Sequence, residues 1–227
     1  MDFSPVLISL KTAAMSIVFT FLLGILCARW VAFMKSPRAK MIIDGILTLP
    51  LVLPPTVLGF FLLLIFGVKR PIGHFILETF GVTIVFTWWA TVIAAVVVAF
   101  PLMYRSARGA FEQVDRDLIY AGRTLGMKEG DIFRRVVIPN ALPGIASGGV
   151  LAFARGLGEF GATIMLAGNI AGRTRTLPLA IYSDVAGGDM QSAYSYVAIL
   201  CVFSFVIVVA LNYFTLRNSR AERRAAR

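Results

Sequence analysis

The stretch that decides the fold is residues 83–104, which read TIVFTWWATVIAAVVVAFPLMY without one charged side chain. About 20 helical residues cross a hydrocarbon core, so this run is long enough to span a membrane. Four further, predominantly apolar runs of similar length lie at 8–28, 42–66, 144–167 and 195–216. The sequence therefore predicts an all-α integral membrane protein with about five transmembrane helices. It forms a single transmembrane domain over residues 1–227, with no room for a soluble domain of ordinary size.

The distribution of charge predicts how these spans are oriented. The chain carries 22 Lys and Arg against 12 Asp and Glu, for a formal charge of +10. Sixteen of the basic residues fall in segments 29–40 and 105–140 and in the tail after residue 216. Cytoplasmic loops of membrane proteins are rich in Lys and Arg. We therefore expect these segments and the C-terminus in the cytoplasm, and the N-terminus outside.

The same distribution argues against a nucleic-acid partner. The segment 105–140 carries five acidic residues among its seven basic ones, so its net charge is only +2. The five arginines of the tail follow a span directly and have no aromatic residues between them, unlike a surface that binds single strands. We expect the tail to contact anionic lipid instead.

The cytoplasmic connector 105–140 is too long to be idle in a compact membrane protein. Its first half places apolar side chains on one helical face, at Leu118, Ala121 and Leu125. After Gly126 a second short helix is predicted, with an apolar face made of Ile132, Phe133, Val136 and Val137. Pro139 is expected to end that helix. Such a pair of helices either docks in a partner's groove or lies on the membrane surface, and the residues alone leave both open.

Two runs of this connector, YAGRTLG at 120–126 and VVIP at 136–139, resemble the EAA loop of ABC-importer permeases. The family pattern is E-A-A-x-x-x-G, then nine residues, then I-x-L-P. Tyr120 stands where the family often has Glu, and Gly122 where it has the second Ala. The resemblance implies that the loop forms coupling helices that insert into an ATPase. The coupling residues that it implies are Tyr120, Ala121, Gly122, Gly126, Val136, Ile138 and Pro139.

The resemblance also implies an assembly and a location. Two copies of this permease would form a homodimer, joined by two ABC ATPase subunits that use ATP-Mg and by an extracytoplasmic oxyanion-binding protein. The complex would lie in a bacterial-type cytoplasmic (inner) membrane. The chain itself has no G-x-x-x-x-G-K-[ST] motif, so ATP hydrolysis is expected on another chain.

Three further segments narrow the resemblance. LPLVLPPTVLG at 49–59 and FARGLGEFGAT at 153–163 are similar to molybdate and sulfate permeases. NIAGRTRTLP at 169–178 looks closer to the molybdate branch. The resemblance implies import of molybdate, with tungstate as a co-substrate, and leaves a sulfate or thiosulfate permease as the alternative.

Residues within the spans are candidates for the translocation path. Arg155 and Glu159 are an i, i+4 pair, and a charge at bilayer depth needs protein or water around it. They form an internal brace, or Arg155 helps an oxyanion to pass. Pro50, Pro54 and Pro55 are expected to kink the second span, either as a packing bend or as part of a gate.

One outer segment carries candidate contacts for an anion or for the delivery protein. Arg173, Thr174 and Arg175 lie close together there, between the fourth and fifth apolar runs. Their charge could attract an oxyanion or pair with an acidic rim on a binding protein. Ordinary solvated charges are the other interpretation.

Two other classes of membrane protein, an intramembrane enzyme and a secondary transporter, fit the sequence less well than an importer subunit does. An intramembrane enzyme needs a nucleophile with its base, or a set of metal ligands, at membrane depth. The chain has one histidine, His74, and two cysteines in separate apolar runs, Cys27 and Cys201. We therefore expect no enzymatic activity, no metal site and no cofactor on this chain. A secondary transporter often shows inverted repeats, and five spans do not divide into equal halves.

Overall fold

The computed structural model describes the backbone of residues 2–225 and the side chains of residues 2–210 and 213. Every regular element in that part of the chain is a helix. In chain order these are α1 (Ser4–Ala32), α2 (Pro37–Val52), α3 (Pro55–Phe66), α4 (Pro71–Phe80), α5 (Trp88–Glu112), α6 (Arg116–Thr124), α7 (Glu129–Ile132), the π-helix η1 (Phe133–Val137), α8 (Ile138–Leu157), α9 (Gly161–Ala167), α10 (Leu177–Ala186) and α11 (Met190–Ala225). Within the described residues, four helices are long and apolar enough to cross a membrane, or five if α2 and α3 form one bent span.

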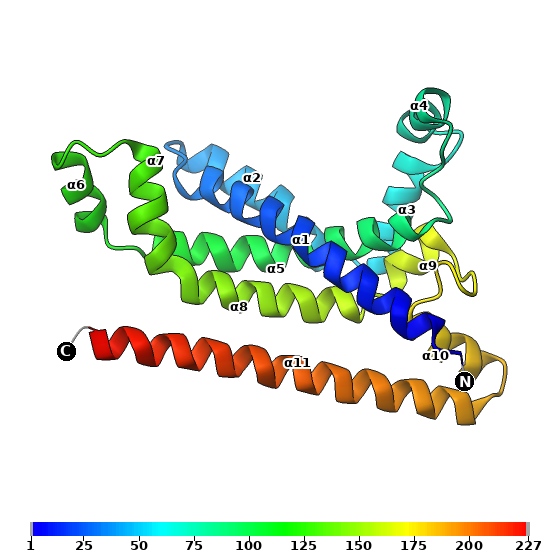
Figure 1. Cartoon of the computed structure of the whole chain (residues 1–227). Coiled ribbons are helices and arrows are strands. Elements are labelled where there is room, and N and C mark those ends of the chain that lie inside the picture. Colours follow the sequence, from blue (N-terminus) through cyan, green and yellow to red (C-terminus); the bar gives the residue numbers. More distant parts are fainter. Residues whose placement is uncertain (1, 226–227) are drawn as a thin grey trace.

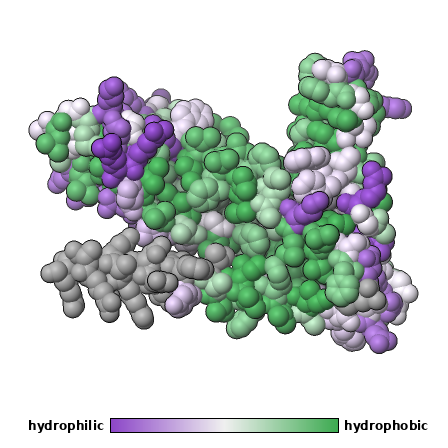
Figure 2. Space-filling model, in the orientation of Figure 1, coloured by the Kyte–Doolittle hydropathy of each residue, from purple (hydrophilic) through white to green (hydrophobic). Residues whose placement is uncertain are grey.

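The long helices α1, α5, α8 and α11 run along a common direction (Figure 1). α6 and α7 cap one end of this bundle, and α3, α4, α9 and α10 gather at the other. Hydrophobic side chains cover the middle of the molecule, whereas hydrophilic ones gather at its ends (Figure 2). The basic segments 29–40 and 105–135 lie at the end with α6 and α7, which we call the inner end in keeping with the predicted orientation. The tail arginines expected to meet lipid lie outside the described side chains.

The central helix is α5, which packs against α1 on one side and α8 on another. Small side chains make this packing close, because Gly24 of α1 faces Met103 and Gly148 of α8 faces Ser106. A methyl group added at Gly148 would lie 2.5 Å from the Ser106 Cβ. Small residues allow membrane helices to approach closely where lipid gives them no hydrophobic reason to associate. Five alanines of α5 are at most 1% exposed: Ala90, Ala94, Ala95, Ala99 and Ala107.

Two of the predicted spans are broken. The run 42–66 forms α2 and α3, whose directions differ by 112° across Leu53 and Pro54. The run 144–167 is helical only to Leu157 and resumes as α9. At the first break, consecutive prolines remove backbone donors and exclude a continuous helix. The expected kink in the second span is therefore a complete interruption.

The other three predicted spans lie on helices with different limits. The run 83–104 is shifted, because Phe86 has a φ of 60° and the helix α5 starts only at Trp88 and continues to Glu112. The run 8–28 lies within α1, and 195–216 lies within α11. Because α5 includes residues 105–112, the connector beyond the bundle is shorter than expected. We call residues 113–132, which contain α6 and α7, the knob.

The expectation that Pro139 ends the second loop helix is wrong. One uninterrupted helical run extends from Glu129 to Leu157 through α7, η1 and α8. In η1 the Ile138 N–H donates to the Phe133 carbonyl, five residues earlier, in a widened turn. The next residue is the proline, which has no N–H to donate. The widened turn leaves room for its ring, so the helix continues.

The close contact of α8 with α5 predicts a stability effect. In Gly148→Ala, the added methyl group meets the Ser106 Cβ, which cannot move without its backbone, and overpacking of this kind costs about 1–3 kcal/mol. We expect a lower Tm for the purified protein in detergent. The matched control is Gly45→Ala on α2, where no atom lies within 4 Å of the added carbon. Equal Tm values for the two variants would contradict the assignment of a tight α5–α8 contact.

Candidate functional site

The first helix of the knob, α6, begins and ends with local features that suit a short helix. The Asp115 carboxylate accepts from the Asp117 N–H (2.9 Å) at the start of α6. At its other end Gly126 has a φ of 74°, a left-handed conformation that glycine adopts without steric cost. The Met127 N–H then donates to the Gly122 carbonyl (3.1 Å) and closes the turn toward α7.

One side of α6 carries apolar side chains that are largely exposed. Leu118 is 44% exposed and Leu125 is 79% exposed there, whereas Tyr120, which is 53% exposed, lies on another side of the helix, roughly 140–160° around it. Gly122 faces inward instead, because a Cβ there would lie 3.1 Å from Ile132 Cγ1 of α7. The knob therefore holds itself together through its inner face and leaves its outer apolar face uncovered by the described side chains.

The seven residues implied by the family resemblance occupy two different places. Tyr120 and Ala121 are exposed on the knob, and Gly122 and Gly126 shape it from within. The other three, Val136, Ile138 and Pro139, belong to the helical run at the base of α8. Tyr120 also lies under the Arg123 guanidinium, at 5.7 Å from the ring centre.

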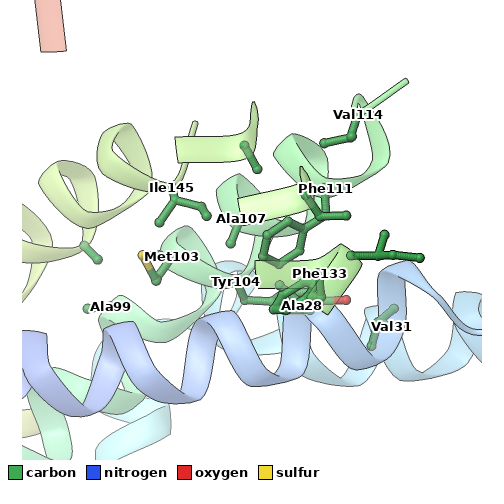
Figure 3. Packing of buried hydrophobic residues seen from close by; sticks show 14 residues of the cluster. Ala28, Val31, Ala99, Met103, Tyr104, Ala107, Phe111, Val114, Phe133 and Ile145 are labelled. Atoms are coloured by element: carbon green, nitrogen blue, oxygen red, sulfur yellow. The ribbon is translucent and has the colours of Figure 1, made fainter. Parts of the chain in front are cut away.

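The root of the knob is an aromatic cluster that sequence patterns did not single out. Phe133 packs edge-on against Phe111 of α5 and Phe33 after α1, with ring centres 5.3 and 6.3 Å away. The Arg29 guanidinium lies 4.2 Å from the Phe133 ring centre. Figure 3 shows Phe111 and Phe133 among the buried hydrophobic side chains of this region. The knob is thus joined to α1, α5 and α8 together, so that a force on it reaches all three.

An ion pair joins the two knob helices. Arg123 of α6 contacts Glu129 of α7 with Nε–Oε1 at 2.7 Å. The hydrogen bonds from this guanidinium lower the pKa of the Glu129 carboxyl below its usual range. Both side chains are solvent-exposed, so the pair contributes little to stability.

At the opposite end of the bundle the two helix breaks meet. A Cβ at Gly161, where α9 starts, would lie 2.9 Å from the Pro55 Cβ at the start of α3. One turn along, a Cβ at Gly59 would lie 2.8 Å from the Ala162 Cα. Pro54 is exposed beside this contact, whereas Pro50 lies half-buried within α2. The proline break and the glycine-rich break therefore form one structural unit.

Arg155 and Glu159 contact each other within this unit. Arg155 Nη1 lies 2.8 Å from Glu159 Oε2, and the Ala162 N–H donates to the other carboxylate oxygen (2.7 Å). Glu159 lies past the end of α8, in the break, and its side chain is only 2% exposed. It therefore caps α9 as well as pairing with Arg155, whose side chain is 33% exposed. The ion pair between Arg155 and Glu159 has the geometry expected of an internal brace.

The three outer candidate residues, Arg173, Thr174 and Arg175, differ in burial and in hydrogen-bond partners. Thr174 is completely buried, and its hydroxyl accepts from the Ile170 N–H (3.0 Å), so it stabilises a turn and is not available to an anion. A threonine between two arginines gives no sign of this burial in the sequence. Arg175 donates through Nε to the Asn169 side-chain oxygen (2.9 Å). Arg173 lies exposed on the same loop.

A charge network at the inner end of α2 and α5 was missed by the sequence patterns. Glu112 accepts from Lys40 Nζ (2.7 Å) and from Arg108 Nε (2.9 Å), and Arg108 also pairs with Asp44. Tyr104 donates its hydroxyl hydrogen to Asp44 Oδ1 (2.9 Å). Only the i, i+4 spacing of Arg108 and Glu112 is visible in the sequence. The other contacts join residues that are far apart along the chain.

Residues 20–220 match the family described as binding-protein-dependent transport system inner membrane component. The chain belongs to this family. Among its relatives, the molybdenum transport system permease protein ModB of Escherichia coli (strain K12) is 40% identical over 219 residues, covering 96% of this chain and 95% of that protein. ModB of Mycobacterium tuberculosis is 41% identical over 209 residues, covering 92% of this chain and 78% of that protein.

Solved transporters share the architecture. A chain of the MetNI methionine ABC transporter in an inward-facing conformation gives a TM-score of 0.73 at 19% identity, over 94% of both chains. A bacterial ABC transporter for import of the acidic polysaccharide alginate gives 0.77 at 16% identity, over 95% of this chain and 79% of that one. These similarities confirm the predicted all-α, multi-pass membrane fold. Family membership makes the chain an inner-membrane transport component rather than an enzyme, and implies a binding protein as partner.

The ion pair at the outer break can be tested as a brace. Arg155→Ala leaves the buried Glu159 carboxylate without its cation, which costs about 3 kcal/mol. Adding Glu159→Gln removes the second charge and keeps an oxygen for the Ala162 N–H. We expect this double variant to recover most of the Tm lost in Arg155→Ala and to retain transport by the assembled complex.

Two comparisons complete that experiment. Glu78→Gln, in the exposed pair with His74 on α4, serves as a control that should change neither Tm nor transport. A double variant with recovered Tm and abolished transport would assign Arg155 to the anion instead of to the brace.

Proposed function

We propose that this chain is the membrane permease subunit of an ATP-driven ABC importer that carries molybdate, with tungstate as a second substrate, into the cell. The observation that carries the proposal is the 40–41% identity to molybdenum permeases, which extends over more than nine-tenths of this chain. The similarity includes the knob and both helix breaks, because it covers nearly the whole length.

The exposed face of the knob supports its use as an ATPase docking surface. An amphipathic helix that leaves its apolar side uncovered is suited to a groove on a partner. In this proposal two copies of the permease form a homodimer, and each knob enters one of two ABC ATPase subunits. ATP-Mg is bound and hydrolysed on those subunits. The aromatic root around Phe133 passes the resulting movement to three long helices at once.

The outer break supports a gate for the substrate. The unit formed by Pro55, Gly161 and Glu159 interrupts two helices at the same level, where regular backbone hydrogen bonding is already absent. Helix ends can move relative to one another there without unwinding a complete span. Arg173, exposed on the outer loop, supplies positive charge that would favour an oxyanion delivered by the binding protein.

Substrate choice is tested by competition. We expect molybdate uptake by the complete complex in proteoliposomes, with its ATPase and binding protein, to be inhibited by excess tungstate and hardly by excess sulfate or thiosulfate. The measurement is initial uptake of labelled molybdate at fixed ATP. Equal inhibition by sulfate would instead make this chain a sulfate or thiosulfate permease. Uptake without any ATP dependence would refute the importer assignment itself.

Docking is tested at Gly126. Gly126→Val forces a β-branched residue into a left-handed conformation, at a cost of about 1–2 kcal/mol, and should distort the turn between α6 and α7. We expect less ATPase to co-purify with this variant. Gly81→Val is the matched control, because Gly81 also has a positive φ (66°) and open space around it but lies at the end of α4, far from the knob. The assignment fails if both variants retain the ATPase equally.

A further inference from the structure

α2 is held to the bundle by charge and by two partly buried apolar side chains, Ile43 and Leu47, which pack against the central core. None of the residues of α2 is fully buried, although its neighbours α1 and α5 each bury ten or more. Two of its side chains, Lys40 and Asp44, reach α5 and enter the charge network with Arg108 and Glu112. The attachment of α2 at this end therefore combines a limited apolar contact with directional, electrostatic contacts.

The network is neutral and only partly shielded from water. It contains two cations and two carboxylates, and their side chains are between 21% and 35% exposed. Shielding strengthens the pairs relative to those on an open surface. Partial exposure also lets water hydrate the charges when they separate, so the network can open and re-form without leaving a dry unpaired ion. A contact of this kind suits an element that changes position during a cycle.

Its place in the fold connects the knob with the outer break. Glu112 is the last residue of α5, and Asp115, three residues later, caps the first knob helix. Asp44 lies on α2, which leads directly to the break at Leu53. Lys40 additionally donates to the Ala32 carbonyl at the end of α1 (3.3 Å). A displacement of the knob thus acts on one end of α2, whose other end forms the break.

We propose that Asp44, Arg108 and Glu112, with Lys40 and Tyr104, are positioning residues that transmit movement of the knob to the α2–α3 break. This inference rests on the proposed function, because it needs an ATPase that moves the knob and a substrate that passes the break. It assigns to the network the coupling of ATP hydrolysis to transport, while docking of the ATPase stays with the exposed face of α6.

The test measures coupling separately from assembly. The complete complex in proteoliposomes is assayed for ATP hydrolysis and for molybdate uptake, and the ratio of the two is compared among variants. In Asp44→Asn we expect hydrolysis within about twofold of the unmodified rate and about tenfold less molybdate per ATP, a typical coupling effect. Asp44→Glu keeps the carboxylate and should restore most of the ratio.

A double variant tests whether the network acts as one unit. Asp44→Asn with Glu112→Gln should lower the ratio no further than either single change, because residues that act together are not additive. Glu78→Gln, in an exposed pair on α4, is the control that should leave the ratio unchanged. Tyr104→Phe removes only the hydroxyl that bonds Asp44 and keeps the buried ring, so it serves if a charge variant fails to assemble. We expect it to lower the ratio about threefold, which is a smaller coupling loss.

The outcomes separate this inference from the proposed function. If Asp44→Asn and Tyr104→Phe both assemble and keep the unmodified ratio of molybdate to ATP, the inference is overturned. It is also overturned if hydrolysis and uptake fall by the same factor, because the network would then be purely structural. If the unmodified complex hydrolyses ATP and takes up no molybdate or other oxyanion, the proposed function is contradicted, whatever the variants of the network do.

Discussion

The close approach of α5 to α1 and α8 is the contact on which the rest of the structure depends. Lipid is as apolar as the helices, so their association relies on contact area between backbones. Glycine on the flanking helices and alanine on α5 supply that contact. From this contact α5 leads to the root of the knob, and α8 leads to the outer break. The knob and the outer break are therefore both attached to one tightly packed centre.

The two ends are built in opposite ways around this centre. At the inner end, Phe133 and Phe111 join the knob firmly to the long helices. At the outer end, Pro55 and Gly161 bring together two helix breaks, where the regular hydrogen bonds of a helix are absent. The rigid inner attachment and the interrupted outer helices suit a protein in which a movement at the inner end opens a path at the outer end.

The sequence predicted the elements that follow from local chemistry and missed those that follow from tertiary contact. Five apolar runs, the turn at Gly126 and the spacing of Arg155 and Glu159 are local features, and each has a counterpart in the structure. Hydropathy averages over about 20 residues, so it could not locate the break after Leu157. The pairing of Asp44 with Arg108 joins two helices, and no spacing rule reveals it. The burial of Thr174 depends on how a loop folds over itself, so no local pattern reveals it.

The π-turn at the base of α8 has a consequence for how the knob is aimed. A π-turn contains one residue more than the α-turn it replaces, and each residue of an α-helix rotates the chain by about 100° and advances it by about 1.5 Å. A chain one residue shorter between Phe133 and Ile138 would form an unbroken α-helix and swing α6 to another side of the bundle. The direction in which the knob projects around the long axis of the bundle is thus determined by the number of residues in one backbone turn. It does not depend on the side chains of the knob.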